Sequence, residues 1–271
     1  VVIPDISYLE ANANRIRGIF LTHGHEDHIG AMPYVMRKLD CPVYATRLTA
    51  GLVRLKLEEH GLADKVRIQT HSAGDTFRVG IFQCELIHVN HSIPDSVAVA
   101  IKTPIGTVIH TGDFKIDLTP IEGGVFEMEF QEGVPVELGY DEGTGMLVYV
   151  ERPGYTDSER HVGESMDALF RGCDKRIIVT TFASNVHRIQ QIIDCAAKYK
   201  RKVGITGRSM ENVIKMAVEE GYMNVPDGVL VEMNRLNSLP ASKTVIVTTG
   251  SQGESMSALY RMAFSEHRQV K

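Results

Sequence analysis

The stretch that decides the fold is HGHEDH, residues 23–28, which follows a short apolar run. Three of the chain's 11 histidines lie in this stretch, together with two acids. At the end of a buried strand, His23 and His25 project to one side of the chain because alternate residues of a strand share a face. Asp27 and His28 fall where the chain turns into a helix, so their side chains can face a second point nearby.

Four imidazole and carboxylate ligands with offset directions suit two adjacent divalent cations better than one. Nitrogen and oxygen donors without thiolate favour Zn²⁺, with Mn²⁺ or Mg²⁺ as further candidates. A single histidine is usually a packed or surface residue, but an HxHxDH pattern after an apolar strand reverses that expectation. The sequence therefore predicts a metal centre.

Two later segments offer further ligands. His91 follows an apolar strand, and His88 lies on that strand with the opposite parity, so only one of the two is expected to face the site. Asp113 also ends a strand, and Gly112 lets the backbone turn so that this carboxylate points inward, where it could bridge two metals.

The apolar pattern separates two halves of the chain, and we place the boundary between residues 145 and 146. In the first half, a helix is expected from Ile29, and residues 123–145 are acidic and glycine-rich, which is typical of a connecting segment. The strands expected in the first half are 17–22, 82–89, 96–103 and 106–110. Strands expected in the second half are 176–182, 202–206 and 244–248, each followed by a helical pattern. This alternation predicts an α/β domain with a parallel, doubly wound sheet.

Composition excludes two classes of protein. The chain has 271 residues, of which 43% are hydrophobic, so it is not a disordered chain. No apolar run approaches the ~20 residues that span a bilayer, so we expect no membrane association. Four widely spaced cysteines without a CxxC pair are typical of reduced thiols, and we expect a cytoplasmic protein.

Charge is divided unevenly between the halves. The whole chain has a formal net charge of −5. Residues 1–145 carry 12 basic and 20 acidic side chains, a net of −8, and residues 146–271 carry 17 and 14, a net of +3. The total argues against a nucleic-acid partner, but the basic second half does not.

Small and hydroxyl residues follow the three strands expected in the second half. Ligands of parallel α/β sheets bind at the carboxyl ends of strands, where free N–H groups of the next helix attract phosphate. Taken singly, these residues are more often helix caps; their coincidence at three strand ends favours a phosphate-binding groove. The candidate residues are Ser184, Asn185, His187, Arg188, Gly207, Arg208, Ser209, Ser251, Gln252 and Gly253.

Seven motifs together carry a family resemblance that runs over nearly the whole chain. They are THGHEDHIGA at 22–31, VNHSIPDS at 89–96, HTGDFKID at 110–117, ERPGYTDSER at 151–160, TFASNVHRIQQ at 181–191, GRSMENV at 207–213 and VTTGSQGE at 247–254. The first motif alone resembles the metallo-β-lactamase superfamily. With the motifs of the second half, the chain resembles the ribonuclease J family, in the β-CASP nuclease branch.

The resemblance implies an αββα metallo-β-lactamase fold, here residues 1–145, with an inserted β-CASP domain, here residues 146–271. It further implies a pair of zinc ions, with His23, His25 and His91 on one, Asp27 and His28 on the other, and Asp113 bridging both. Asp27 and Asp113 would be the catalytic residues.

The activity that the resemblance implies is hydrolysis of RNA phosphodiester bonds by a hydroxide activated by two metals. Members of the family are 5′→3′ exonucleases, many with endonuclease activity, in mRNA decay and rRNA maturation. The expected substrate is single-stranded RNA with a 5′-monophosphate. The expected assembly is a dimer or tetramer, or a hetero-oligomer with a paralogue.

The chain departs from the family pattern in three places. The family's first strands do not precede Val1, the family's acidic motif is absent at the join of Val150 and Glu151, and the two later histidine motifs do not occur before Lys271. We therefore expect both domains to be partial and the chain by itself not to be fully active. Glu151 does not replace the missing acid.

Two other functions stay open from the sequence. A small-molecule hydrolase of the metallo-β-lactamase fold would use the same HxHxDH stretch but would leave residues 146–271 without a role. A non-catalytic paralogue that binds RNA or a nuclease would not need six metal ligands.

Overall fold

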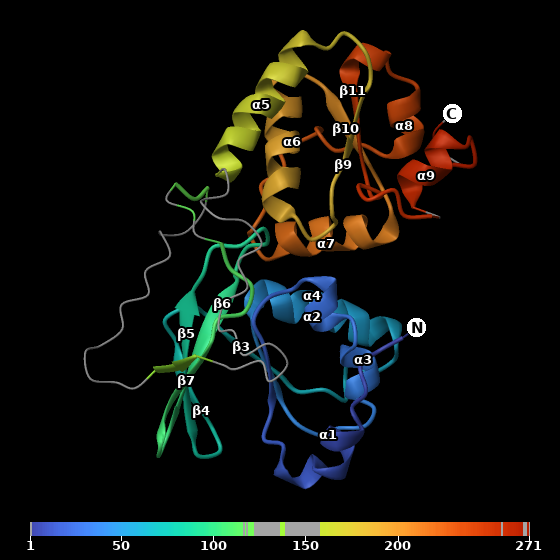
Figure 1. Cartoon of the computed structure of the whole chain (residues 1–271). Coiled ribbons are helices and arrows are strands. Elements are labelled where there is room, and N and C mark those ends of the chain that lie inside the picture. Colours follow the sequence, from blue (N-terminus) through green and yellow to red (C-terminus); the bar gives the residue numbers. More distant parts are fainter. Residues whose placement is uncertain are drawn as a thin grey trace. The chain divides into compact units, whose positions relative to one another are not determined.

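The structure is a computed structural model that describes residues 2–115, 117, 119–121, 136–138, 158–255, 257–267 and 270. The chain divides into two compact units, Val1–Asp157 (unit 1) and Ser158–Lys271 (unit 2), which are drawn in Figure 1. The predicted domain boundary between residues 145 and 146 lies outside the described residues, so it stays a prediction.

Unit 1 contains two β-sheets. The first has the order β1-β2-β3 and is parallel throughout; the second has the order β4-β5-β6-β7-β8. Its first four strands are antiparallel neighbours, and β8 runs parallel to β7. The strands are β1 (Ile19–Leu21), β2 (Val43–Thr46), β3 (Ile68–His71), β4 (Thr76–Val79), β5 (Phe82–His88), β6 (Val97–Thr103), β7 (Gly106–His110) and β8 (Val136–Leu138).

The strands predicted in the first half are confirmed, and β6 and β7 are joined by a tight turn at Pro104 and Ile105. The interpretation of residues 123–145 as purely a connecting segment was wrong, because β8 lies within it and pairs with β7. Alternation along three residues is too short a pattern to indicate a strand.

The helices of unit 1 are α1 (Ser7–Ala11), α2 (Glu26–Ile29), α3 (Met32–Val35) and α4 (Arg47–Glu59), with a 3₁₀ turn at Ala13–Arg15. The helix expected from Ile29 was wrong in its bounds, because the helical pattern is divided between α2 and α3. Pro33 occupies the first turn of α3, where its missing N–H costs nothing, but it could not continue a preceding helix. Helix α4 connects β2 and β3 and contacts both.

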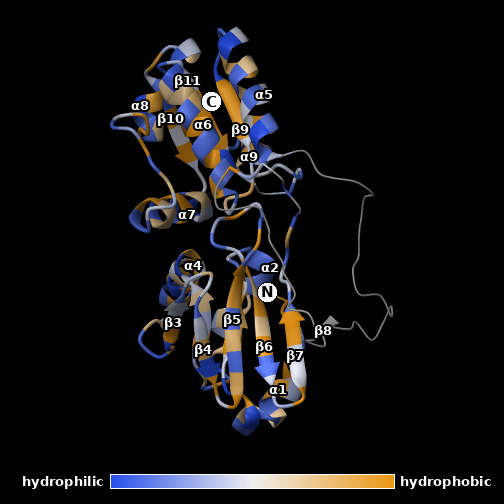
Figure 2. Ribbon diagram, turned by 90° about the vertical axis from the view of Figure 1, so that its left-hand side faces the viewer, coloured by the Kyte–Doolittle hydropathy of each residue, from blue (hydrophilic) through white to orange (hydrophobic). Residues whose placement is uncertain are grey.

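The core of unit 1 is formed where strands pack through their apolar faces. Cys84 and Leu86 of β5 and Val97 and Val99 of β6 form a buried cluster, and Phe20 of β1 packs against it. Figure 2 shows these strands as largely hydrophobic. The second sheet thereby contacts the first sheet through apolar side chains, as in a two-sheet sandwich.

Unit 2 is built on a three-stranded parallel sheet with the order β10-β11-β9. All five residues of the central strand β11 are buried. The strands are β9 (Ile177–Thr180), β10 (Lys202–Thr206) and β11 (Thr244–Thr248). The helices are α5 (Glu159–Gly172), α6 (Val186–Lys198), α7 (Arg208–Glu219), α8 (Met233–Asn237) and α9 (Ala258–Ala263), with a 3₁₀ turn at Ala241–Lys243.

Helices flank this sheet on both sides, which confirms the predicted doubly wound arrangement. Helices α6 and α8 both contact β10, and Figure 1 shows them on opposite sides of the sheet. Ile189, Ile192 and Ile193 of α6 are completely buried, as their spacing predicted. Helix α5 was not predicted. It forms an ion pair with α6, between Glu159 and Arg188.

Two smaller expectations concern the whole chain. All four cysteines are free. Within the described residues, every helix is too short or too polar to cross a bilayer.

Candidate metal centre

The six predicted metal ligands of unit 1 either follow strands or lie in the short helix α2. His23 and His25 follow β1, and Asp27 and His28 lie in α2, immediately after them. His91 follows β5, and Asp113 follows β7. Strands β5 and β7 run in the same direction, because each pairs antiparallel with β6, so their carboxyl ends share one edge of the sheet.

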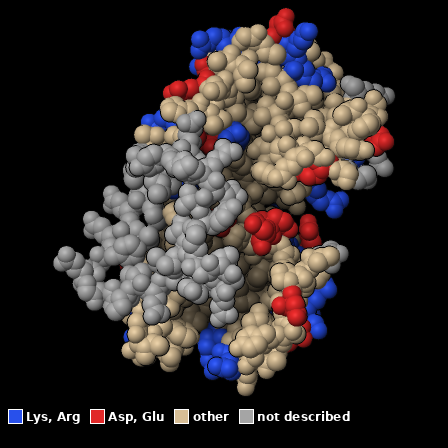
Figure 3. Space-filling view, in the orientation of Figure 1, with Lys and Arg blue, Asp and Glu red and all other residues tan. Residues whose placement is uncertain are grey.

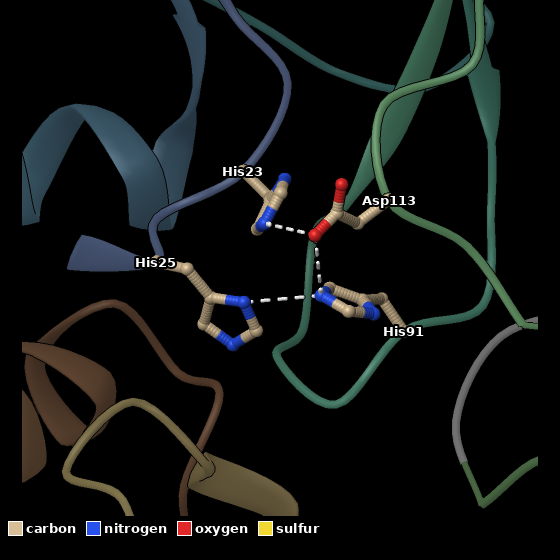
Figure 4. Close-up of side chains that lie close together, drawn as sticks. All are labelled: His23, His25, His91 and Asp113. Carbon is tan, nitrogen blue, oxygen red and sulfur yellow. Dashed lines mark hydrogen bonds and ion pairs between the residues drawn. The ribbon is translucent and has the colours of Figure 1, made fainter. Parts of the chain in front are cut away.

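The first group consists of His23, His25, His91 and Asp113, whose ligand atoms lie within 4.8 Å of one another. Figure 4 shows these four side chains pointing toward one another. His91 Nε2 lies 3.0 Å from His25 Nδ1, and Asp113 Oδ2 lies 3.9 Å from both His23 Nε2 and His91 Nε2. Three imidazoles and a carboxylate make a four-ligand set of the kind that zinc takes.

The second group consists of Asp27, His28 and Asp113. His28 Nε2 lies 3.5 Å from Asp113 Oδ2 and 3.6 Å from Asp27 Oδ2. Asp113 therefore belongs to both groups, through the same oxygen atom that faces His23. A carboxylate shared by two ligand groups has the position of a bridging ligand between adjacent cations.

Gly112 is required where the chain places Asp113. Its φ of +57° lies in the left-handed region that favours glycine, and a Cβ there would lie 2.8 Å from Cβ of Thr22. A larger residue would strain the backbone and displace the strand that carries His23. The positive φ of Gly112 and the close approach of the Thr22 side chain thus explain why glycine is needed before Asp113.

Burial keeps the histidines of the first group neutral. Burial, followed by the charges of the neighbouring His28, His91 and His25 rings, lowers the pKa of His23 to about 3. Burial, followed by the His25 ring, lowers the pKa of His91 to about 4, and burial also lowers the pKa of His25. A neutral imidazole is the form that binds a cation.

One atom of the site has no hydrogen-bond partner. His23 is completely buried, and its Nε2 is among the buried polar atoms without a partner. A buried polar atom without a partner is costly unless something else satisfies it. A cation held by the first group would satisfy this atom, so the residues fit the metal that the donor set predicts.

Two polar residues near the site are directed elsewhere. Glu26, although inside the HGHEDH stretch, pairs with Lys56 of α4 at 2.6 Å. His88 lies 3.4 Å from the Asn90 side chain and belongs to neither ligand group. Of the two histidines, His91 therefore lies in a ligand group and His88 does not.

The chain closely matches curated ribonucleases. It is 43% identical over its whole length to ribonuclease J of Synechocystis sp., 42% identical to ribonuclease J of Thermus thermophilus and 39% identical to ribonuclease J2 of Bacillus subtilis. Residues 2–130 match the metallo-β-lactamase superfamily, and residues 174–271 match the β-CASP domain of ribonuclease J. The chain is therefore similar to ribonuclease J over its whole length, and its two matched segments correspond to two domains of that kind.

The match covers only part of these relatives. The chain spans 42% of the Synechocystis protein and 48% of each of the other two. Among solved structures, it resembles a protein of unknown function from Enterococcus faecalis at 16% identity, with a TM-score of 0.59 over 93% of this chain and 68% of that one. At that identity, the likeness concerns the fold alone.

The phosphate-binding residues predicted in unit 2 follow the carboxyl ends of β9, β10 and β11. These ends share one edge because the strands are parallel and in register. The residues in question are Ser184, Asn185, His187 and Arg188 after β9, Gly207, Arg208 and Ser209 after β10, and Ser251, Gln252 and Gly253 after β11.

The side chains of Asn185 and Arg188 have partners inside the protein. Asn185 Oδ1 accepts a hydrogen bond from the backbone N–H of Arg188 at 3.2 Å, which caps α6. Arg188 Nε donates to Glu159 of α5 at 2.5 Å, in a pair that is mostly buried. The alternative role as helix cap is therefore present at Asn185, and phosphate binding stays a prediction.

Five of the predicted phosphate-binding residues are exposed. Arg208 begins α7 and is exposed, as is Ser209, and the residues from Ser251 to Gly253 are exposed after β11. On the face drawn in Figure 3, basic and acidic side chains of unit 2 alternate and do not form one continuous basic surface. The net charge of +3 in this half therefore does not define a nucleic-acid surface on that face.

Two contacts of the metal centre were not singled out from the sequence. The Thr22 hydroxyl lies 3.0 Å from His23 Nδ1, and the Ser92 hydroxyl lies 3.2 Å from His25 Nε2. Thr22 is next to His23 in the chain and Ser92 is next to His91. Their place beside the histidines was the available signal, but it does not reveal which ring nitrogen each would contact.

Proposed function

We propose that the chain forms the metal-binding part of a metal-dependent ribonuclease that hydrolyses phosphodiester bonds of RNA. One observation carries this proposal: six side chains from three segments of unit 1 form two ligand groups that share Asp113. Similarity to ribonuclease J supplies the substrate class. Unit 2 matches a β-CASP domain. An RNA substrate gives this half of the chain a role, whereas a small-molecule hydrolase would leave it without one.

The residues favour zinc, two ions per complete site, with Mn²⁺ or Mg²⁺ as alternatives. His23, His25, His91 and Asp113 would hold one ion, and Asp27, His28 and Asp113 the other. When bound, two divalent cations supply the charge that acidifies a water molecule and stabilises negative charge on the phosphate.

The chain's own residues prepare this chemistry. Lowered pKa values keep the imidazoles of His23 and His91 neutral at physiological pH, so neither repels a cation. Asp27 is 77% exposed on its side chain, while its Oδ2 lies beside His28, so this carboxylate faces solvent from the second ligand group. We assign Asp27 the task of orienting the attacking water by accepting a hydrogen bond from it.

Finer aspects of the function follow the family. We propose 5′→3′ exonuclease activity on single-stranded RNA with a 5′-monophosphate, together with endonuclease activity, in mRNA decay and rRNA maturation in the cytoplasm. We propose a homodimer or homotetramer, or a hetero-oligomer with a paralogue. The exposed Arg208 and the loop Ser251–Gly253 are the described candidates for phosphate contacts.

The test compares the full-length protein with its His25→Ala variant. With zinc or manganese, the full-length protein should degrade 5′-monophosphorylated single-stranded RNA, and the variant should not. RNA of the same sequence with a 5′-triphosphate or 5′-hydroxyl tests the end preference, and a 5′ label separates release of mononucleotides from internal cleavage. Equal degradation by both proteins would refute the proposal.

Metal analysis separates the nuclease from a non-catalytic paralogue. The nuclease should retain close to two metal ions per full-length chain. Fewer than one ion per chain, together with RNA binding but no cleavage, would establish the non-catalytic role.

A further inference from the structure

Two hydroxyl groups beside the metal ligands contact different ring nitrogens of neighbouring histidines. Thr22 Oγ1 lies 3.0 Å from Nδ1 of His23, whereas Ser92 Oγ lies 3.2 Å from Nε2 of His25. The histidines are only two residues apart in the chain. Because the two imidazoles are chemically identical, the difference between them lies in their surroundings.

At His23, Thr22 contacts Nδ1, so Nε2 is the ring nitrogen that faces the ligand group. Nε2 is buried without a hydrogen-bond partner and lies 3.9 Å from Asp113 Oδ2. Because Thr22 contacts Nδ1, the ring can rotate little without losing this bond.

At His25, the arrangement is reversed. Nδ1 lies 3.0 Å from His91 Nε2, inside the first ligand group, and Nε2 points to Ser92. His25 thus presents Nδ1 to the same point to which His23 and His91 present Nε2.

A neutral imidazole carries one N–H donor and one lone pair, and a cation binds the lone pair. The N–H must then donate to an acceptor, and a hydroxyl oxygen is one. We propose that Thr22 and Ser92 are positioning residues that select the ring nitrogen offered to the metal: Thr22 accepts from Nδ1–H of His23, and Ser92 accepts from Nε2–H of His25. This inference rests on the proposed metal-dependent function.

The fold holds both hydroxyls in place by contacts that involve no metal ligand. Thr22 is 4% exposed, and its carbonyl accepts a hydrogen bond from the N–H of Val97. The loop of Ser92 is fixed at its far end, where Asp95 accepts from the backbone N–H of Leu48 at 3.0 Å. The hydroxyls are therefore preorganised parts of the site.

The test measures zinc affinity of the full-length protein by competition with a chelator. Removing either hydroxyl, in Ser92→Ala or Thr22→Val, should weaken zinc binding roughly 10- to 100-fold, the usual effect of losing such a partner. The conservative variants Ser92→Thr and Thr22→Ser keep the hydroxyl and should recover most of the affinity.

Ser96→Ala is the matched control for Ser92→Ala. Ser96 lies in the same loop and donates to the carbonyl of Ile93, but contacts no histidine of the site in the described contacts. This variant should bind zinc like the wild type. Cobalt(II) replaces zinc for a second readout: the visible absorption of bound cobalt should change in Ser92→Ala, where the ligand nitrogen is no longer selected, and should not change in Ser96→Ala.

The outcomes separate the inference from the function it rests on. Wild-type affinity and an unchanged cobalt spectrum in both Ser92→Ala and Thr22→Val would overturn the inference, as would equal loss of affinity in Ser92→Ala and Ser92→Thr. Failure of the wild-type protein to bind zinc or any other divalent cation would instead overturn the proposed function.

Discussion

The metal centre of unit 1 and the phosphate-binding residues of unit 2 were both predicted from polar residues that follow strands. The two sets differ in whether their side chains converge in the structure. In unit 1 all six predicted ligands converge, and His23 keeps a buried atom without a partner. In unit 2, Asn185 and Arg188 already serve a helix cap and an ion pair. Polar residues at the ends of strands indicate a binding site when their polar atoms converge on one point, and their position at a strand end alone does not suffice.

The variant with the largest expected effect tests whether the predicted ligands of unit 1 act together as one metal centre. Asp113→Ala removes the carboxylate that belongs to both ligand groups, so the full-length protein should lose at least one metal ion per chain. Its RNA cleavage should fall by roughly 10²- to 10³-fold or more, the scale for losing one electrostatic group of an active site. Metal content and cleavage rate measure both effects. Glu85→Gln, which alters an exposed pair with Lys102, is the control.

A metal content of two in Asp113→Ala would contradict the shared role of this carboxylate.

The second-largest effect concerns how the free energy of unfolding depends on pH, through the buried histidines of unit 1. In the folded, metal-free protein, His23 stays neutral down to about pH 3 and His91 to about pH 4, whereas in the unfolded chain both take up a proton near pH 6.5. The unfolded state binds more protons in this range, so stability falls as pH drops below 6.5, by about 1.4 kcal/mol per pH unit for each histidine.

Urea unfolding with a chelator, followed from pH 7 to pH 4.5, measures this loss. His161→Gln, at an exposed position of unit 2, should follow the wild-type curve, and His23→Gln should show a weaker dependence on pH. If the free energy of unfolding of His23→Gln fell as steeply with pH as that of the wild type, His23 would not be a cause of the pH dependence.

Two arginines of unit 2 offer a smaller but sharper comparison. Arg188→Ala leaves Glu159, 15% exposed on its side chain, without its partner, and should lower the free energy of unfolding by roughly 1–3 kcal/mol. Arg208→Ala, at an exposed position, should change stability by less than about 0.5 kcal/mol. If Arg208 contacts phosphate, its loss should also reduce the salt dependence of RNA binding by about one ion.

Urea unfolding and RNA titrations at several salt concentrations measure the two effects. Weaker RNA binding in Arg188→Ala at unchanged stability would place Arg188 in the phosphate site after all.

The smallest effect concerns the helix cap. Asn185→Ala should lower the free energy of unfolding by about 1 kcal/mol, because the backbone N–H of Arg188 loses its acceptor. Asn185→Asp keeps an acceptor and should recover this stability. If Asn185 also binds phosphate, the added negative charge of Asn185→Asp should weaken RNA binding while stability is kept, so the pair of variants separates the two roles.

Sequence predicted regular elements best where a pattern repeats. The three strands of unit 2 and the helix that follows each of them were predicted, because buried strands alternate with amphipathic helices such as α6, whereas α5 and α8 were not predicted. The helix from Ile29 was predicted too long, since Met32 and Met36 keep helical spacing across the interruption before Pro33. Strand β8 was missed because pairing with β7, and not local alternation, makes it a strand.

The sequence by itself determined the family resemblance, the donor types and the need for glycine before Asp113, because these depend on residue identity and on neighbours in the chain. Only the tertiary structure decided that His91 and not His88 joins the site, that Asp113 belongs to both groups, and that Thr22 and Ser92 contact opposite nitrogens of two histidines. It also decided that Arg188 faces Glu159. These choices depend on strand direction and packing between segments as many as 90 residues apart, such as His23 and Asp113, and no local pattern encodes such a distance.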